Sequence, residues 1–258
     1  SNQRRPFYPP LTIVEFWGSG ANSNYNSGQV SLDKRFRNGF SIVASYTFSK
    51  SIDDTFGAGT DGFASDPGNF RIERGPSVFD RTHAFVNSFV WDLPSAGGWN
   101  GAMNTVLGGW QLTGIASLYG GTPTIYSASQ DRALNGQPNR PNRIRDPRLD
   151  AARPRGDRIL QYFDRTAFAV NSTGQIGNAP LKDGQVRAPG SAQFDLGVNK
   201  TFPLTERFRL QFRSEFFNLF NRPNFGAPGG NIDANTFTRI TTTVDGPRII
   251  QFGMKLLF

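Results

Sequence analysis

Long segments in which apolar and polar residues alternate constrain the fold of this chain more than any other feature. In residues 207–217, large apolar side chains occupy alternate positions and charged side chains lie between them. Successive side chains of a β-strand point to opposite faces, so the pattern predicts a strand with one apolar and one polar face. The charged residues of the polar face are Arg207, Arg209, Arg213 and Glu215.

The same alternation recurs along the chain. Residues 26–51 are predicted to form a two-stranded hairpin, because Asn38 and Gly39 at its centre tolerate the positive φ of a tight turn. Further strands are predicted at 81–93, 109–120, 193–202 and 247–258, and an eighth near 11–17.

Strand length distinguishes a membrane protein from a soluble one. The predicted strands run to about twelve residues, whereas soluble strands usually have about 5–6. At ~3.3 Å per residue and a tilt of about 45°, such a strand spans roughly 28 Å, the thickness of a hydrocarbon core. The sequence therefore predicts an all-β fold, an antiparallel transmembrane outer-membrane β-barrel.

The connections between the predicted strands support this fold class. Short turns are expected at 38–39 and 203–206 and a medium connection at 94–107. Long polar loops are expected at about 52–79, 121–190 and 221–246. Outer-membrane barrels have short turns on the periplasmic side and long loops outside the cell.

Composition excludes several other classes. There is no cysteine, which excludes disulfides and thiolate metal sites, and the mean hydropathy of −0.43 argues against a helical membrane protein. The net charge of +8 and pI of 10.2 raise the question of nucleic acid binding. Many arginines lie in residues 131–158 among aspartates and prolines, so we expect a solvated loop and no nucleic acid partner.

The last predicted strand is similar to the C-terminal signal of outer-membrane barrels. The matching positions are Gln251, Gly253, Leu256 and Phe258. In that family the barrel assembly machinery recognises this strand, which then closes against the first strand. Lys34 and Lys200 fall on the apolar face near short turns, where we expect their ammonium groups to reach the periplasmic headgroups.

Four phrases of the chain, in this order, resemble the C-terminal barrel part of Oar-like TonB-dependent transporters. They are NSNYNSGQVSLDKRFRNGFSIVASYTFSKSID, ERGPSVFDRTHAFVNSFVWDLP, LGGWQLTGIASLYGGTP and FRSEFFNLFNRPNFGAP, and the resemblance covers about residues 20–258. It implies a Gram-negative outer-membrane barrel of 22 strands with an internal plug. Residues 1–258 are then expected to be a C-terminal portion without the plug, through which TonB would drive uptake of an unknown ligand.

The resemblance also implies which residues face the lumen. The candidates are Asp33, Arg35, Asp195, Arg207, Arg209, Arg213 and Glu215. Such residues either contact a transported ligand or pair with the plug and with each other across strands.

Motifs for chemistry are scarce, so we expect no enzyme, no cofactor and no metal site. The single histidine, His83, follows Asp80 and Ser77 closely enough to suggest a hydrolase at the barrel rim, but nothing marks a nucleophile. Asp61 and Asp66 lie in a glycine-rich loop that could bind Ca²⁺, although a plain loop is the simpler interpretation.

Two other classes of protein remain open. One is a small self-contained barrel of eight strands with a structural or adhesion role. The other is a soluble β-sandwich that binds a ligand. No leader segment is recognisable, so we expect a mature product or a piece of a longer chain. As part of a larger barrel it would leave two open edges, which predicts aggregation of the isolated chain.

Overall fold

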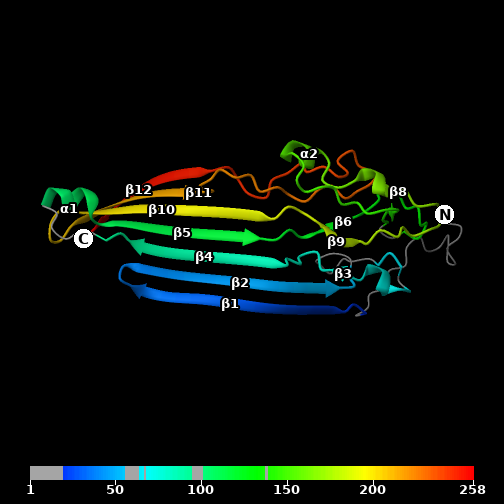
Figure 1. Cartoon of the computed structure of the whole chain (residues 1–258), viewed down its shortest axis with the longest axis horizontal. Helices are drawn as coiled ribbons and strands as arrows, with labels where there is room; N and C mark the ends of the chain where they lie inside the picture. The colour runs from blue at the N-terminus through cyan, green and yellow to red at the C-terminus, as the bar shows by residue number, and fades with distance from the viewer. Residues whose placement is uncertain (1–19, 56–63, 67, 95–100, 137–138) are drawn as a thin grey trace, which may run out of the picture.

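One antiparallel sheet of long strands dominates the computed structural model, which describes residues 20–55, 64–66, 68–94, 101–136 and 139–258 (Figure 1). The seven long strands are β1 (Ser23–Arg37), β2 (Phe40–Asp53), β4 (His83–Asp92), β5 (Trp110–Tyr119), β10 (Ser191–Pro203), β11 (Arg209–Phe217) and β12 (Ile249–Leu257). They confirm the seven strands predicted from the sequence. The eighth, predicted near 11–17, lies outside the described residues.

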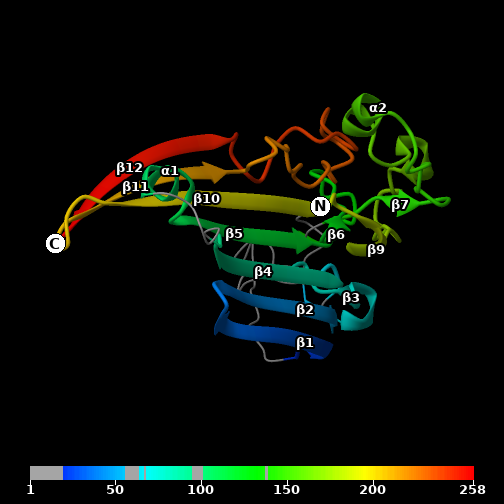
Figure 2. The same cartoon turned by 60° about the vertical axis from the view of Figure 1, so that its left-hand side comes forward.

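The strands lie side by side in the order β1-β2-β4-β5-β10-β11-β12, and each pairs antiparallel with the next. Within the described residues β1 pairs only with β2, and β12 only with β11. Figure 2 places these two edge strands at opposite margins of the sheet. The sheet therefore has two open edges in the part of the chain described, as expected for a portion of a larger barrel, and the last strand does not close against β1.

The number of strands explains why the sheet is open. Because the direction alternates along the sheet, β1 and β12 run the same way. An antiparallel ladder cannot join them directly, and parallel pairing is slightly less stable per residue. Antiparallel closure needs an odd number of additional strands between the two edges.

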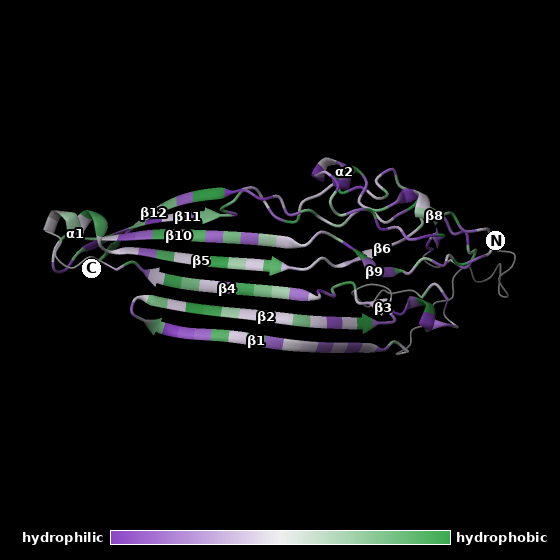
Figure 3. Cartoon of the chain, in the orientation of Figure 1, coloured by the Kyte–Doolittle hydropathy of each residue, from purple (hydrophilic) through white to green (hydrophobic). Residues whose placement is uncertain are grey.

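Cross-strand register divides the side chains of the sheet into two faces. Residues directly opposite each other point to the same side, so Phe212, Met254 and Lys200 share one face and Arg213, Gly253 and Asn199 share the other. Figure 3 shows the resulting alternation of hydrophobic and hydrophilic residues along single strands. We call these the apolar face and the polar face.

No segment that the structure describes covers most of the apolar face. Phe252 is 69% exposed and Met254 75% exposed, and both lie on this face of β12. Val30 on β1 and Phe48 on β2 are similarly exposed. None of the described helices is long and apolar enough to cross a membrane. A large exposed apolar surface of this kind needs an apolar surrounding.

The connections segregate to the two ends of the sheet (Figure 1). At the turn end lie the Asn38-Gly39 turn, the turn after β10, and helix α1 (Gly101–Leu107), which the sequence did not predict. At the loop end lie the three long connections, which we call the loop cap: the described residues of 54–82, 120–190 and 218–248. As expected, the short connections lie at one end of the sheet and the long connections at the other.

The loop cap holds the buried hydrophobic core of the described chain, although the sequence predicted polar loops there. Its short elements are 3-10 helix η2 (Phe70–Glu73), β3 (Gly75–Pro76), β6 (Pro123–Ile125), β7 (Asn142–Arg143), α2 (Arg155–Leu160), 3-10 helix η3 (Arg165–Ala167), β8 (Phe168–Ala169) and β9 (Lys182–Arg187). Tyr126, Phe163, Phe168 and Phe237 form the centre of the core, with ring centroids 4.6–5.6 Å apart. These few aromatic residues come from separate parts of the loops, so no periodic sequence pattern predicts that they form a core.

Gly39→Ala tests the hairpin turn. Gly39 has a φ of +76°, and a Cβ at this position would lie 2.8 Å from the carbonyl oxygen of Asp92. The left-handed conformation alone costs an L-residue about 1–2 kcal/mol. We expect a lower urea midpoint in detergent micelles. Gly28→Ala is the control, because a Cβ there meets no atom within 4 Å; an equal loss in both variants would contradict the role of the turn.

Candidate functional site

The polar face gathers most of the charged residues that were predicted to face a lumen. Arg213 lies opposite Asn199, which lies opposite Gln111, and the same face continues across the sheet to β1. The predicted residues that this register places together on the polar face are Asp33, Asp195, Arg209, Arg213 and Glu215. They come from strands β1, β10 and β11.

The two remaining candidates lie at less regular positions. Arg35 is in β1 at an irregularity of the register between Lys34 and Arg37, and Arg207 is in the turn that precedes β11. The predicted strand therefore starts two residues too early. Both Arg35 and Arg207 are exposed.

Neighbours on the polar face hold several of these side chains. Gln251 of β12 donates a hydrogen bond to the Glu215 carboxylate, and the Arg213 Nε donates to Gln211 Oε1 at 2.9 Å. The Asp195 carboxylate accepts the backbone N–H of Asn218 at 2.8 Å. On the polar face, side-chain and backbone amides therefore position the charged groups through hydrogen bonds.

The residues of the predicted C-terminal signal divide between the two faces. Gln251 and Gly253 lie on the polar face of β12, and Leu256 lies on the apolar face. Phe258 follows the end of β12 and is 91% exposed.

Ion pairs with buried carboxylates hold the loop cap together, and one of them joins it to the end of β2. Lys182 of β9 donates to Asp53 at the end of β2, and Arg187 donates to Asp80 at 2.6 Å. Arg140 Nη1 lies 3.4 Å from Glu73 Oε2, and these side chains are only 3% and 0% exposed. Each pair joins segments far apart in the sequence, which is why no local sequence pattern predicts it.

The described part of the arginine-rich segment 131–158 fits the expected solvated loop only in part. Arg145, Arg148 and Arg155 are exposed. Arg140 is buried against Glu73, and Arg143 lies 3.3 Å from Asp183, which is itself 2% exposed. Only the pair of Arg148 and Asp146 is fully at the surface. The carboxylates that pair with Arg140 and Arg143 belong to Glu73 and Asp183, which lie outside the segment itself.

Burial and pairing shift pKa values inside the loop cap. Burial lowers the pKa of Arg140, and the charge of Glu73 offsets this only in part. Burial, together with the neighbouring Asp183 carboxylate, raises the pKa of Tyr126. At the surface, hydrogen bonds from Arg148 lower the pKa of Asp146 to about 2.

The structure does not bring His83, Ser77 and Asp80 together as a catalytic group. His83 Nδ1 lies 2.8 Å from the Tyr46 hydroxyl on the apolar face. The Asp80 carboxylate instead accepts the backbone N–H of Ser51 at 2.6 Å, and the Ser77 and Ser51 hydroxyls lie 2.8 Å apart.

The described residues contain no group of three or more potential metal ligands. Asp66 accepts the backbone N–H of Gly68 at 2.9 Å, as in a plain turn. Asp61, the other residue of the suggested Ca²⁺ loop, lies outside the described residues.

Lys200 does not reach a headgroup layer as expected. It is 1% exposed and donates a hydrogen bond to the backbone carbonyl of Gly108. Its Nζ also lies 5.5 Å from the ring centroid of Trp110 and 5.1 Å from that of Phe202. The segment after α1 covers this lysine, which the strand pattern alone could not show. Lys34 remains exposed, with its Nζ 4.9 Å from the Phe40 ring centroid.

An antiparallel sheet with an exposed apolar face, a hydrogen-bonded polar face, and turns and loops at opposite ends defines a transmembrane β-barrel wall. Such walls belong to outer membranes. The chain belongs to the family described as outer membrane beta barrel domain, which matches residues 1–251. The comparisons with curated proteins and with solved structures found no match.

Phe252→Arg tests the assignment of the faces. A charge on the lipid side of a barrel strand costs about 2–4 kcal/mol near the bilayer midplane. We therefore expect Phe252→Arg to reduce the folded fraction in lipid vesicles, measured by heat-modifiable gel migration. Gln251→Arg, one residue away on the polar face and next to Glu215, should fold nearly as well as the parent. The opposite order of the two variants would reverse the faces.

Proposed function

We propose that this chain forms part of the barrel wall and the loop cap of an Oar-like TonB-dependent transporter. The barrel family and the outer-membrane location are established above. The resemblance of the four sequence phrases supports the narrower assignment. In this proposal the loop cap faces the cell exterior, where it meets an unknown ligand, and TonB acts through a plug that is not among residues 1–258.

The four sequence phrases carry the transporter proposal, and the open sheet is consistent with it. β1 and β12 lie at opposite margins and run the same way, and the outer edge of each has no partner strand within the described residues (Figure 2). Exposed edges are not tolerated in a bilayer, so further strands must complete the wall. The alternative of an eight-stranded barrel needs one strand to bridge both edges.

Cysteine cross-linking of the full-length gene product distinguishes the two barrel sizes, because the chain itself has no cysteine. Ser31 of β1 and Gly253 of β12 both lie on the polar face. In an eight-stranded barrel one strand separates β1 from β12, so the two cysteines would lie within about two strand spacings, roughly 10 Å. A bismaleimide of that reach should not link Ser31→Cys and Gly253→Cys in a large barrel. Efficient linking in the outer membrane would refute the transporter proposal.

Adjacent strands provide the control for this cross-link. Ser31 lies opposite Ser45 of β2, so Ser31→Cys with Ser45→Cys should link in either barrel. TonB coupling is tested separately. The purified periplasmic domain of TonB should co-purify with the full-length product, and absence of an interaction would leave a barrel without energy coupling.

The strand β12 is also proposed to bind the barrel assembly machinery, as the residues Gln251, Gly253, Leu256 and Phe258 suggested. Its unpaired edge within the described sheet supports this role, because such an edge can add a strand of another protein. We propose no enzymatic activity. The separation of His83 from Asp80 and Ser77 supports that position.

A further inference from the structure

Three cationic side chains gather on the polar face near the turn end of β11 and β12. Arg209 lies opposite Leu257, and Arg213 lies opposite Gly253. Lys255 lies between these two partner positions, so it is diagonal to both arginines. Diagonal neighbours have Cα atoms about 7–8 Å apart, within reach of long side chains. We call Arg209, Arg213 and Lys255 the basic triangle.

The basic triangle lacks an acidic partner within the described residues. None of the ion pairs formed there includes Arg209, Arg213 or Lys255, and all three side chains are exposed. The carboxylate of Glu215 is nearby, but it accepts the hydrogen bond from Gln251. This differs from the loop cap, where arginines such as Arg140 are paired with carboxylates.

A hydrogen bond positions the guanidinium of Arg213, and there is open space beside it. The hydrogen bond from the Arg213 Nε to Gln211 orients the guanidinium, whose terminal amino groups bond no described residue. Gly253 stands opposite Arg213, and even a Cβ there would meet nothing within 4 Å. A hollow lined by Arg213, Glu215 and Lys255, among others, lies at this place.

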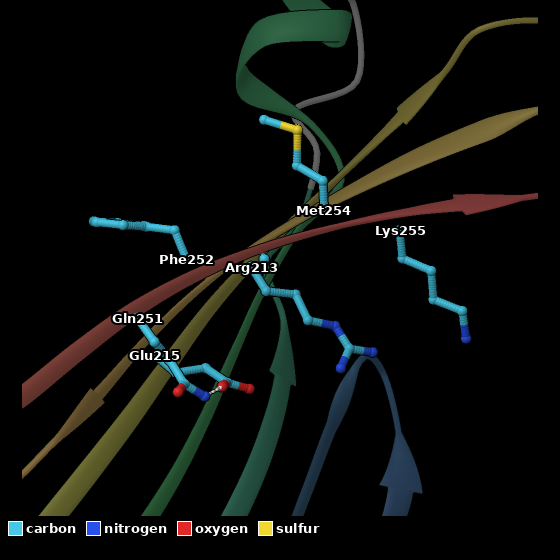
Figure 4. Close-up of a pocket in the computed structure, with 7 residues that line it drawn as sticks. Arg213, Glu215, Gln251, Phe252, Met254 and Lys255 are labelled. Atoms are coloured by element: carbon cyan, nitrogen blue, oxygen red, sulfur yellow. Dashed lines mark hydrogen bonds between the residues drawn. The ribbon is translucent and has the colours of Figure 1, made fainter.

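Figure 4 shows how the side chains around the hollow divide. Phe252 and Met254 project from one side of β12, and Arg213 and Lys255 project from the other, together with the bonded pair of Gln251 and Glu215. The cations therefore point away from the apolar face, toward the side that lines the lumen in the proposed barrel. A guanidinium with free amino groups matches the geometry of a carboxylate or phosphate.

We propose that the basic triangle is an anion-binding site on the lumenal wall, and that the ligand passing it is a small solute with at least two negative oxyanion charges. The inference rests on the proposed function, because it needs the polar face to line a wet passage. We infer two or more charges because three cations from two strands share this part of the polar face. A single charge could engage only part of the site.

Titration with pyrophosphate tests the site. The full-length gene product in detergent micelles is titrated by calorimetry at low and at physiological ionic strength. We expect Arg213→Gln combined with Lys255→Gln to weaken pyrophosphate binding at least roughly tenfold, since charge-assisted hydrogen bonds are lost. The double variant Lys255→Arg with Arg213→Lys keeps both charges and should lose less affinity than the neutral one.

A matched control removes the same charge elsewhere. Arg71 and Arg74 are exposed at the loop end, so Arg71→Gln with Arg74→Gln lowers the net charge equally without touching the triangle. This control should bind pyrophosphate like the parent. Heat-modifiable migration confirms that each variant is folded.

Two results would overturn the inference. One is absence of pyrophosphate binding to the parent protein. The other is equal weakening of binding by Arg213→Gln with Lys255→Gln and by the control Arg71→Gln with Arg74→Gln, which indicates only diffuse attraction. The cross-link between β1 and β12 uses no anion, so it reports on the proposed function independently. Efficient cross-linking together with site-specific pyrophosphate binding would reject the transporter and retain the anion site.

Discussion

Glu73→Leu is expected to destabilise the loop cap by about 3–5 kcal/mol, because it leaves the guanidinium of Arg140 buried without its counter-charge. The side chains of this pair are 0% and 3% exposed, and Glu73 also accepts the backbone N–H of Ser65 at 2.9 Å. Urea unfolding in micelles, followed by near-ultraviolet circular dichroism of the aromatic core, measures the loss. The migration of the folded barrel should change little.

The double variant Glu73→Leu with Arg140→Met separates the charge from the packing. A buried ion pair replaced by apolar groups of similar size is often close to neutral, so most of the stability should return. Arg148→Met removes one member of the exposed pair with Asp146 and should have no measurable effect. If Arg148→Met were as damaging as Glu73→Leu, burial would not be the cause.

Phe163→Ala should cost the loop cap about 3–5 kcal/mol, the usual effect of removing a fully buried aromatic ring. Phe163 is 0% exposed, and its ring meets those of Tyr126, Phe168 and Phe237 edge to face at 5.4–5.6 Å. Edge-to-face contacts add to the area that the ring buries. The same urea titration detects the change.

An exposed phenylalanine of the loop cap provides the comparison. Phe79 is 62% exposed, so Phe79→Ala removes an identical side chain while opening no cavity. We expect its unfolding midpoint to stay near that of the parent. A similar loss in both variants would mean that the aromatic cluster does not hold the cap together.

The strands could be predicted because their information is local. A residue such as Phe212 faces lipid and its neighbour Arg213 faces the polar side, and this alternation is visible in the sequence without any partner. The Asn38-Gly39 turn was equally visible, since both residues have positive φ. The polar-face positions of Asp33, Asp195, Arg209, Arg213 and Glu215 followed from the same parity.

The sequence by itself thus determined a membrane barrel wall, its two faces and its short and long sides. Only the tertiary structure decided that the long loops form one folded cap with its own buried core. Glu73 meets Arg140, and Lys182 meets Asp53, across 67 and 129 residues of chain. No sequence periodicity links such positions, because their contacts form only when distant loops pack together at the loop end of the sheet. Local alternation fixes a strand, whereas the loop cap depends on long-range packing and charge pairing.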